Sequence, residues 1–104
     1  MNHRVQETAA LETTADGRAR IVGSLVFTTV NALLPAGSDA IRRGQASVID
    51  LAGVAESDSA GLALLIEWLS VAHGAGRSLR YDNIPSQLHQ LARLSEVEEL
   101  IAVG

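Results

Sequence analysis

One stretch, residues 47–74, constrains the fold more than any other part of the sequence. It begins with a short apolar segment, Val48–Leu51, of the kind that forms a buried strand. A polar turn follows and ends in Asp58–Gly61, and a strongly apolar run then continues to Ala72. A buried strand, a polar turn and a long helix predict an α/β fold with Ser59 at or beside the helix N-cap. That position lies at the rim of a sheet, where α/β folds usually hold their functional residues.

The N-terminal third predicts a hairpin followed by an irregular helix. Residues 5–14 and 18–25 alternate loosely between apolar and polar side chains, and Asp16-Gly17 between them is a hairpin turn signal. A helix capped from the Thr28-Thr29 pair is expected next, because apolar residues follow at near-helical spacing. Pro35, which removes a backbone donor, and Gly37 are expected to make this helix irregular. We expect the helix to be short, broken or displaced near Pro35.

The C-terminal third predicts one more strand and two helices. Residues 78–81 form the strand, Pro85-Ser86 begins a third helix, and a last helix follows Ser95. This order predicts an α/β fold with a mixed, mostly parallel sheet of about four strands, an N-terminal hairpin and three to four helices. With 104 residues, no internal repeat and no low-complexity linker, residues 1–104 are expected to form a single domain.

Composition argues against several classes of protein. The net charge is −4, all eight basic residues are arginine, and no basic cluster exceeds Arg42-Arg43, so no nucleic-acid surface is expected. The chain has no cysteine, which excludes disulfides and thiolate metal sites. Its three histidines lack metal-ligand spacing, so no metal site is expected. No Gly-rich loop with lysine is present to hold phosphates, so no cofactor is expected. Without a long apolar run or a signal peptide, we expect a cytosolic protein with no direct membrane insertion.

The main helix, from Ser59 to about His73, is expected to present an outer face with little side-chain bulk near its start. A helix turns about 100° per residue, which places on the sheet-facing side Gly61, Leu65, Trp68, Leu69 and Ala72. The opposite side and its margin hold Ala60, Ala63, Leu64 and Glu67. Such a surface lets another chain approach closely, although alanine is also simply the best helix former.

Three roles are open for Ser59. Its hydroxyl could cap the helix, which contributes about 1 kcal/mol. It could accept a phosphate, which would meet free N–H groups at the helix start but would be repelled by Asp58. It could also be a nucleophile, which needs a base nearby. His73 lies about 20 Å away along the helix, His89 is on another helix, and no Gly-x-Ser-x-Gly elbow is present. We therefore expect no enzyme activity.

Structural roles are sufficient for several other polar side chains. Asp58 is expected to be a turn residue that bonds its local backbone. Asp50 is expected to be a carboxylate at a strand end, and His89 a solvated helix residue beside Gln87 and Gln90.

At these residues the sequence resembles a STAS domain, the family of bacterial anti-sigma-factor antagonists and of the cytoplasmic domains of sulfate transporters. The resemblance is carried by Val48-Ile49-Asp50-Leu51, then Val54, then Asp58-Ser59-Ala60-Gly61-Leu62. It covers most of the chain and is weak over residues 1–17. Ser57 departs from the family pattern, in which an apolar residue usually precedes the aspartate.

The resemblance implies one of two functions. In antagonists, the residue equivalent to Ser59 is phosphorylated, which releases the protein from an anti-sigma-factor kinase. In the Mla pathway, which maintains outer-membrane lipid asymmetry, a small STAS subunit binds the ATPase subunit of a phospholipid-transporting ABC system and supports its assembly and activity. The sequence is more similar to the second branch in Gly61–Leu69 and Leu91–Leu100. Antagonists also more often carry serine where Ala60 stands.

The resemblance therefore implies a non-catalytic regulatory subunit, cytoplasmic and peripheral to the inner membrane, whose partner is the ATPase. The alternative is a phosphoserine switch whose partner is an anti-sigma-factor kinase. In an interface of standard size, each partner buries roughly 800 Å² of its surface. The residues expected to supply it are Asp58, Ser59, Ala60, Ala63, Leu64, Glu67, Gln87, His89 and Gln90. Ser59 is also the candidate phosphorylation site.

Overall fold

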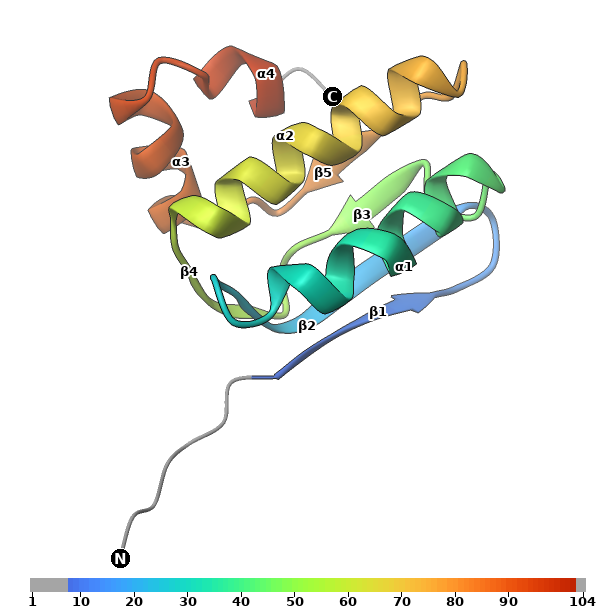
Figure 1. Cartoon of the computed structure of the whole chain (residues 1–104), viewed down its shortest axis with the longest axis horizontal. Helices are drawn as coiled ribbons and strands as arrows, with labels where there is room; N and C mark the ends of the chain where they lie inside the picture. Colours follow the sequence, from blue (N-terminus) through green and yellow to red (C-terminus); the bar gives the residue numbers. More distant parts are fainter. Residues whose placement is uncertain (1–7, 103–104) are drawn as a thin grey trace, which may run out of the picture.

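A mixed sheet with helices packed against it forms the framework of the computed structural model, which describes residues 8–102 (Figure 1). The sheet contains five strands. In chain order the elements are β1 (Ala9–Thr13), β2 (Arg18–Leu25), α1 (Val30–Arg42), β3 (Val48–Asp50), β4 (Val54–Ser57), α2 (Ser59–Gly74), β5 (Arg80–Asp82), α3 (Ser86–Leu94) and α4 (Glu98–Ala102). The predicted α/β class, hairpin and helices are confirmed. Residues 5–7 of the predicted first strand lie outside the described residues.

Strand β2 is the centre of the sheet. It pairs antiparallel with β1 and parallel with β3, and β3 pairs parallel with β5. The fifth strand, β4, was not predicted. Residues 18–20 of β2 pair with β3, which leaves the end of this eight-residue strand open. After a short turn, β4 pairs with that end, opposite Gly23 and Leu25. The sheet is mostly parallel, as predicted.

The core lies between one face of the sheet and the helices. Along β2, Ala19 and Ile21 are buried while Arg18, Arg20 and Val22 are exposed, as expected for a strand with one covered face. Helices α1 and α2 lie side by side over the covered face, and α3 and α4 pack on the other side of α2 (Figure 1). The largest fully buried side chains are Trp68, Ile21, Leu25, Ile41, Ile49, Leu51, Leu65, Leu88 and Ile101.

Helix α1 runs without a break through Pro35, so the prediction of a helix that is short, broken or displaced there is wrong. The proline is exposed, and the missing N–H costs one helical hydrogen bond. Burial of Leu33, Ala40 and Ile41 on the inner face offsets that cost. Thr29 occupies the N-cap position but makes no side-chain cap. Its hydroxyl instead donates to the carbonyl oxygen of Ser24, 2.7 Å away, and holds the preceding loop.

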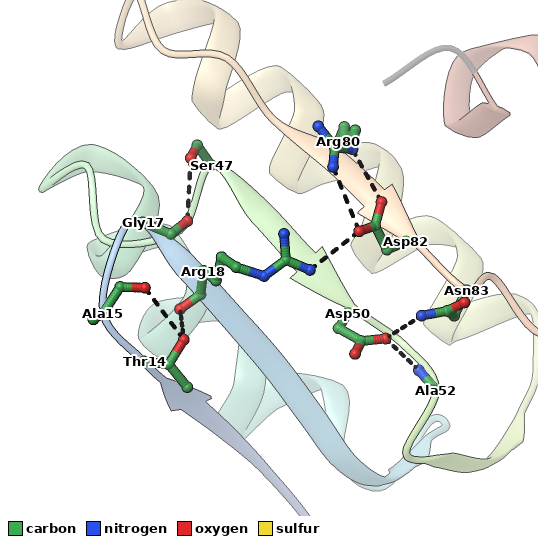
Figure 2. A network of polar contacts seen from close by, with 10 residues as sticks. All are labelled: Thr14, Ala15, Gly17, Arg18, Ser47, Asp50, Ala52, Arg80, Asp82 and Asn83. Carbon is green, nitrogen blue, oxygen red and sulfur yellow. Dashed lines mark hydrogen bonds and ion pairs between the residues drawn. The ribbon is translucent and has the colours of Figure 1, made fainter.

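The other face of the sheet is polar (Figure 2). Asp82 on β5 accepts hydrogen bonds from Arg80 at 3.0 Å and from Arg18 of β2 at 3.2 Å, and these bonds lower the pKa of the Asp82 carboxyl. Asp50 accepts from the Asn83 side chain and the Ala52 N–H, each at 2.9 Å, which lowers the pKa of Asp50. Asp50 is therefore a structural carboxylate at a strand end, as predicted.

Candidate functional site

The turn before α2 is organised by Asp58. One carboxylate oxygen of Asp58 accepts hydrogen bonds from the N–H groups of Ala60 at 2.9 Å and Gly61 at 3.1 Å. The other oxygen accepts from the N–H of Phe27, also at 3.1 Å, which ties the end of β2 to the start of α2. Asp58 is thus the N-cap, and its predicted role as a residue that bonds its local backbone is confirmed.

Ser59 is the first residue of α2 rather than its cap, so the capping role considered for its hydroxyl is wrong. A carboxylate has two acceptor oxygens and satisfies three backbone donors here, which one hydroxyl could not do. Ser59 is exposed, and within residues 8–102 its hydroxyl makes no hydrogen bond to a base or to any other group. The serine is therefore free to face solvent or another chain at the start of the helix.

An open groove of about 400 Å³ runs between the first turns of α1 and α2. Its α2 wall consists of four residues that the helical spacing predicted for the partner surface, Ala60, Ala63, Leu64 and Glu67. Its other wall comes from the end of the β2–α1 loop and from α1, namely Phe27, Val30, Asn31 and Leu34. The Phe27 residue is 75% exposed and Leu34 is 37% exposed. The groove is therefore an accessible, mainly apolar surface.

The α3 residues predicted for the same surface lie elsewhere. Helix α3 packs on the side of α2 away from α1 (Figure 1), so Gln87, His89 and Gln90 do not line the groove. The Gln87 side chain accepts a hydrogen bond from the N–H of Ser57 at 3.3 Å. His89, predicted to be solvated, is half-buried, with its Nδ1 3.9 Å from Glu98 of α4. Gln90 is exposed.

Ser57 lies at the end of β4, and in the sequence it stands out only as a departure from the family pattern. It is 4% exposed. Among the residues that the structure describes, nothing hydrogen-bonds its Oγ. A buried hydroxyl without a partner costs about 1–3 kcal/mol. The serine therefore destabilises the end of β4, directly before Asp58 and Ser59.

We predict that Ser57→Ala stabilises the domain by about 1 kcal/mol, because it removes the unpaired hydroxyl and leaves only a small space. The free energy of unfolding from urea titration measures the effect. Ser24→Ala is a control, because Ser24 is also a buried serine on a paired strand, but its hydroxyl is not among the fully buried groups that lack a partner within residues 8–102. We expect no stabilisation in that control. A loss of stability in Ser57→Ala would show that the hydroxyl contributes favourably.

Asp58→Ala is expected to cost about 2–3 kcal/mol of unfolding free energy, because it removes a cap and also the bond to Phe27. Ser59→Ala, one residue along, should change stability by less than about 0.5 kcal/mol, since that hydroxyl is exposed and unbonded. Thermal and urea unfolding of both variants test the assignment. Equal losses in the two variants would contradict it.

Within the described part of the chain, no helix is long and apolar enough to cross a membrane. Residues 8–102 also contain no group of three or more acidic or histidine side chains arranged to hold a metal ion.

Comparison with known protein families gives a match over almost the whole described chain. A family model described as "Mlab, STAS domain" matches residues 9–102, which include every strand and helix. A search of curated proteins found no match. The match includes the groove, the Asp58 cap and the polar face of the sheet.

Proposed function

The chain belongs to the STAS domain family, and we propose that it is a non-catalytic, cytoplasmic subunit of a phospholipid-transporting ABC system. STAS domains are generally binding domains without catalytic activity. In this proposal the chain binds the ATPase subunit, supports or regulates its activity, and lies at the inner membrane only through that complex. The transporter would maintain the lipid asymmetry of the outer membrane.

The observation that carries the proposal is the accessible start of α2. Ser59 and Ala63 are exposed, and Ala60 is half-buried. Beside them, the buried Leu64 gives the groove an apolar lining. Small side chains at a helix start allow the backbone of a second protein to come close. Within the described residues no side chain hydrogen-bonds the Ser59 hydroxyl. This supports a role in which the chain presents a binding surface and the ATPase supplies the chemistry.

An antagonist of an anti-sigma factor is the second candidate, favoured by the exposed hydroxyl of Ser59. A phosphate there would not find the helix N-terminus free, because Asp58 already accepts from Ala60 and Gly61. It would instead stand beside a carboxylate and change the surface charge. Intact mass after incubation with cell lysate and ATP tests this candidate: a phosphate lost in Ser59→Ala would favour it.

Affinity purification from native membranes tests the leading proposal. The tagged full chain is expected to recover an ABC ATPase and its permease, and Ser59→Arg is expected to lose them because the long cation occupies the approach to α2. Recovery of an anti-sigma-factor kinase without an ATPase would refute the proposal. The fold of Ser59→Arg is checked by its unfolding midpoint, which should match that of the unmodified protein.

A further inference from the structure

The groove between α1 and α2 has the form of a receptor for a short helix. Its α2 wall extends from Ala60 to Glu67, which corresponds to about two helical turns or roughly 10 Å. Phe27, which is 75% exposed, and Leu34 line the wall opposite α2. A helix that docks into such a groove does so through apolar side chains spaced three, four and seven residues apart.

The charge at the groove is negative. Among the described residues that line it, Glu67 alone is charged, and it is exposed. Most exposed arginines lie on the polar sheet face or at the far ends of the helices, and within residues 8–102 no cation pairs with Glu67. An incoming cation would therefore find an acidic partner here that no side chain of the described chain neutralises.

We infer that this groove binds an amphipathic helix of a protein partner, with two or three apolar side chains between Phe27 and Leu64 and an arginine or lysine against Glu67. The inference rests on the proposed function only in requiring that a protein approaches the start of α2. A small polar ligand fits poorly, because the described walls hold just two polar residues, Asn31 and Glu67. The exposed Glu67 carboxylate disfavours the headgroup of an anionic phospholipid at this groove.

Two synthetic helices test the inference on the full, isotope-labelled chain. Both carry the same leucine face, and the polar face carries lysine in one peptide and glutamate in the other. In NMR titrations, the lysine peptide should shift the backbone amides of residues 27–34 and 60–67 and should bind at least threefold more tightly than the glutamate peptide. An exposed ion pair supports a difference of this size.

Charge reversal separates the groove from the overall charge of the protein. Glu67→Arg should reverse the preference between the two peptides. Glu56→Arg makes the same change in net charge on β4, outside the groove, and should leave the preference unchanged. Equal effects of the two variants, or peptide-induced shifts on the polar sheet face instead, would overturn the inference.

Other occupants have their own signatures. Shifts of the same amides by phosphatidylglycerol–phosphatidylethanolamine vesicles, or on concentrating the protein alone, would assign the groove to lipid or to a second copy and overturn the inference. Its failure is distinguishable from failure of the proposed function. Groove binding by the lysine peptide without recovery of an ATPase refutes the function alone, and the reverse result refutes the helix receptor alone.

Discussion

Gly37→Ala is expected to destabilise the domain by about 2–3 kcal/mol, although alanine is the better helix former. A Cβ atom at Gly37 would stand 2.2 Å from Cζ2 and 2.3 Å from Cε2 of the Trp68 ring. The indole is fully buried, and its Nε1 donates to the carbonyl oxygen of Leu34 at 3.3 Å. Because a rigid ring in a packed core cannot turn aside, α1 must move away from α2.

Gly74→Ala is the matched control for this prediction. Gly74 also lies in a helix, but a Cβ there would meet nothing within 4 Å. We expect this variant to be unchanged or stabilised by up to about 1 kcal/mol. Urea unfolding compares the two variants. In a Gly37→Ala, Trp68→Leu double variant the clash is absent, so the two losses should not add. Equal stability of the two glycine variants would contradict close α1–α2 packing.

Gly37 illustrates what the sequence alone can and cannot predict. The spacing of apolar residues correctly predicts that Leu65, Trp68 and Ala72 of α2 are buried, because that spacing depends only on helical geometry. In the sequence, however, Gly37 lies close to Pro35, and the two residues together predict an irregular helix. Its actual function, which is to let the Trp68 ring approach α1, depends on a residue 31 positions away.

Strand β4 and the cap of α2 could not be predicted for related reasons. Val54–Ser57 is short and partly polar, and it becomes a strand because the end of β2 is open beside it. Asp58 and Ser59 are both good capping residues, so composition does not choose between them. The choice follows from the position of the Phe27 N–H, which only a second carboxylate oxygen can satisfy.

The sequence points to one wall of the groove and not to the other. Helical geometry identifies the α2 wall of the groove, but the opposite wall requires knowing that α1 lies beside α2. Phe27 is one of three aromatic residues in the chain, and it stands in a turn rather than on an apolar face. The turn position of Phe27 is the sequence feature that could have predicted its exposure. An exposed aromatic residue beside a groove often marks an interaction site. The sequence does not specify on which side of α2 helix α3 packs, and Gln87, His89 and Gln90 lie away from the groove.

Ala63→Trp is expected to weaken binding of the proposed ATPase at least about 100-fold, or roughly 2.7 kcal/mol. Ala63 is exposed and lines the groove, so an indole there would fill the space that a partner's side chains need. Because the side chain lies at the surface, unfolding free energy should change by less than about 0.5 kcal/mol. Titration of the purified chain with the ATPase, by calorimetry or surface plasmon resonance, measures the affinity.

Ala36→Trp provides the same substitution on a helix outside the groove. Ala36 is an exposed residue of α1 and does not line the groove, so this variant should bind the ATPase with unchanged affinity. The pair therefore separates blockage of the groove from the general effect of an exposed tryptophan. If Ala63→Trp binds as tightly as Ala36→Trp, the partner does not use the groove. The α3 side of α2, where Gln87 and His89 lie, would then be the next surface to test.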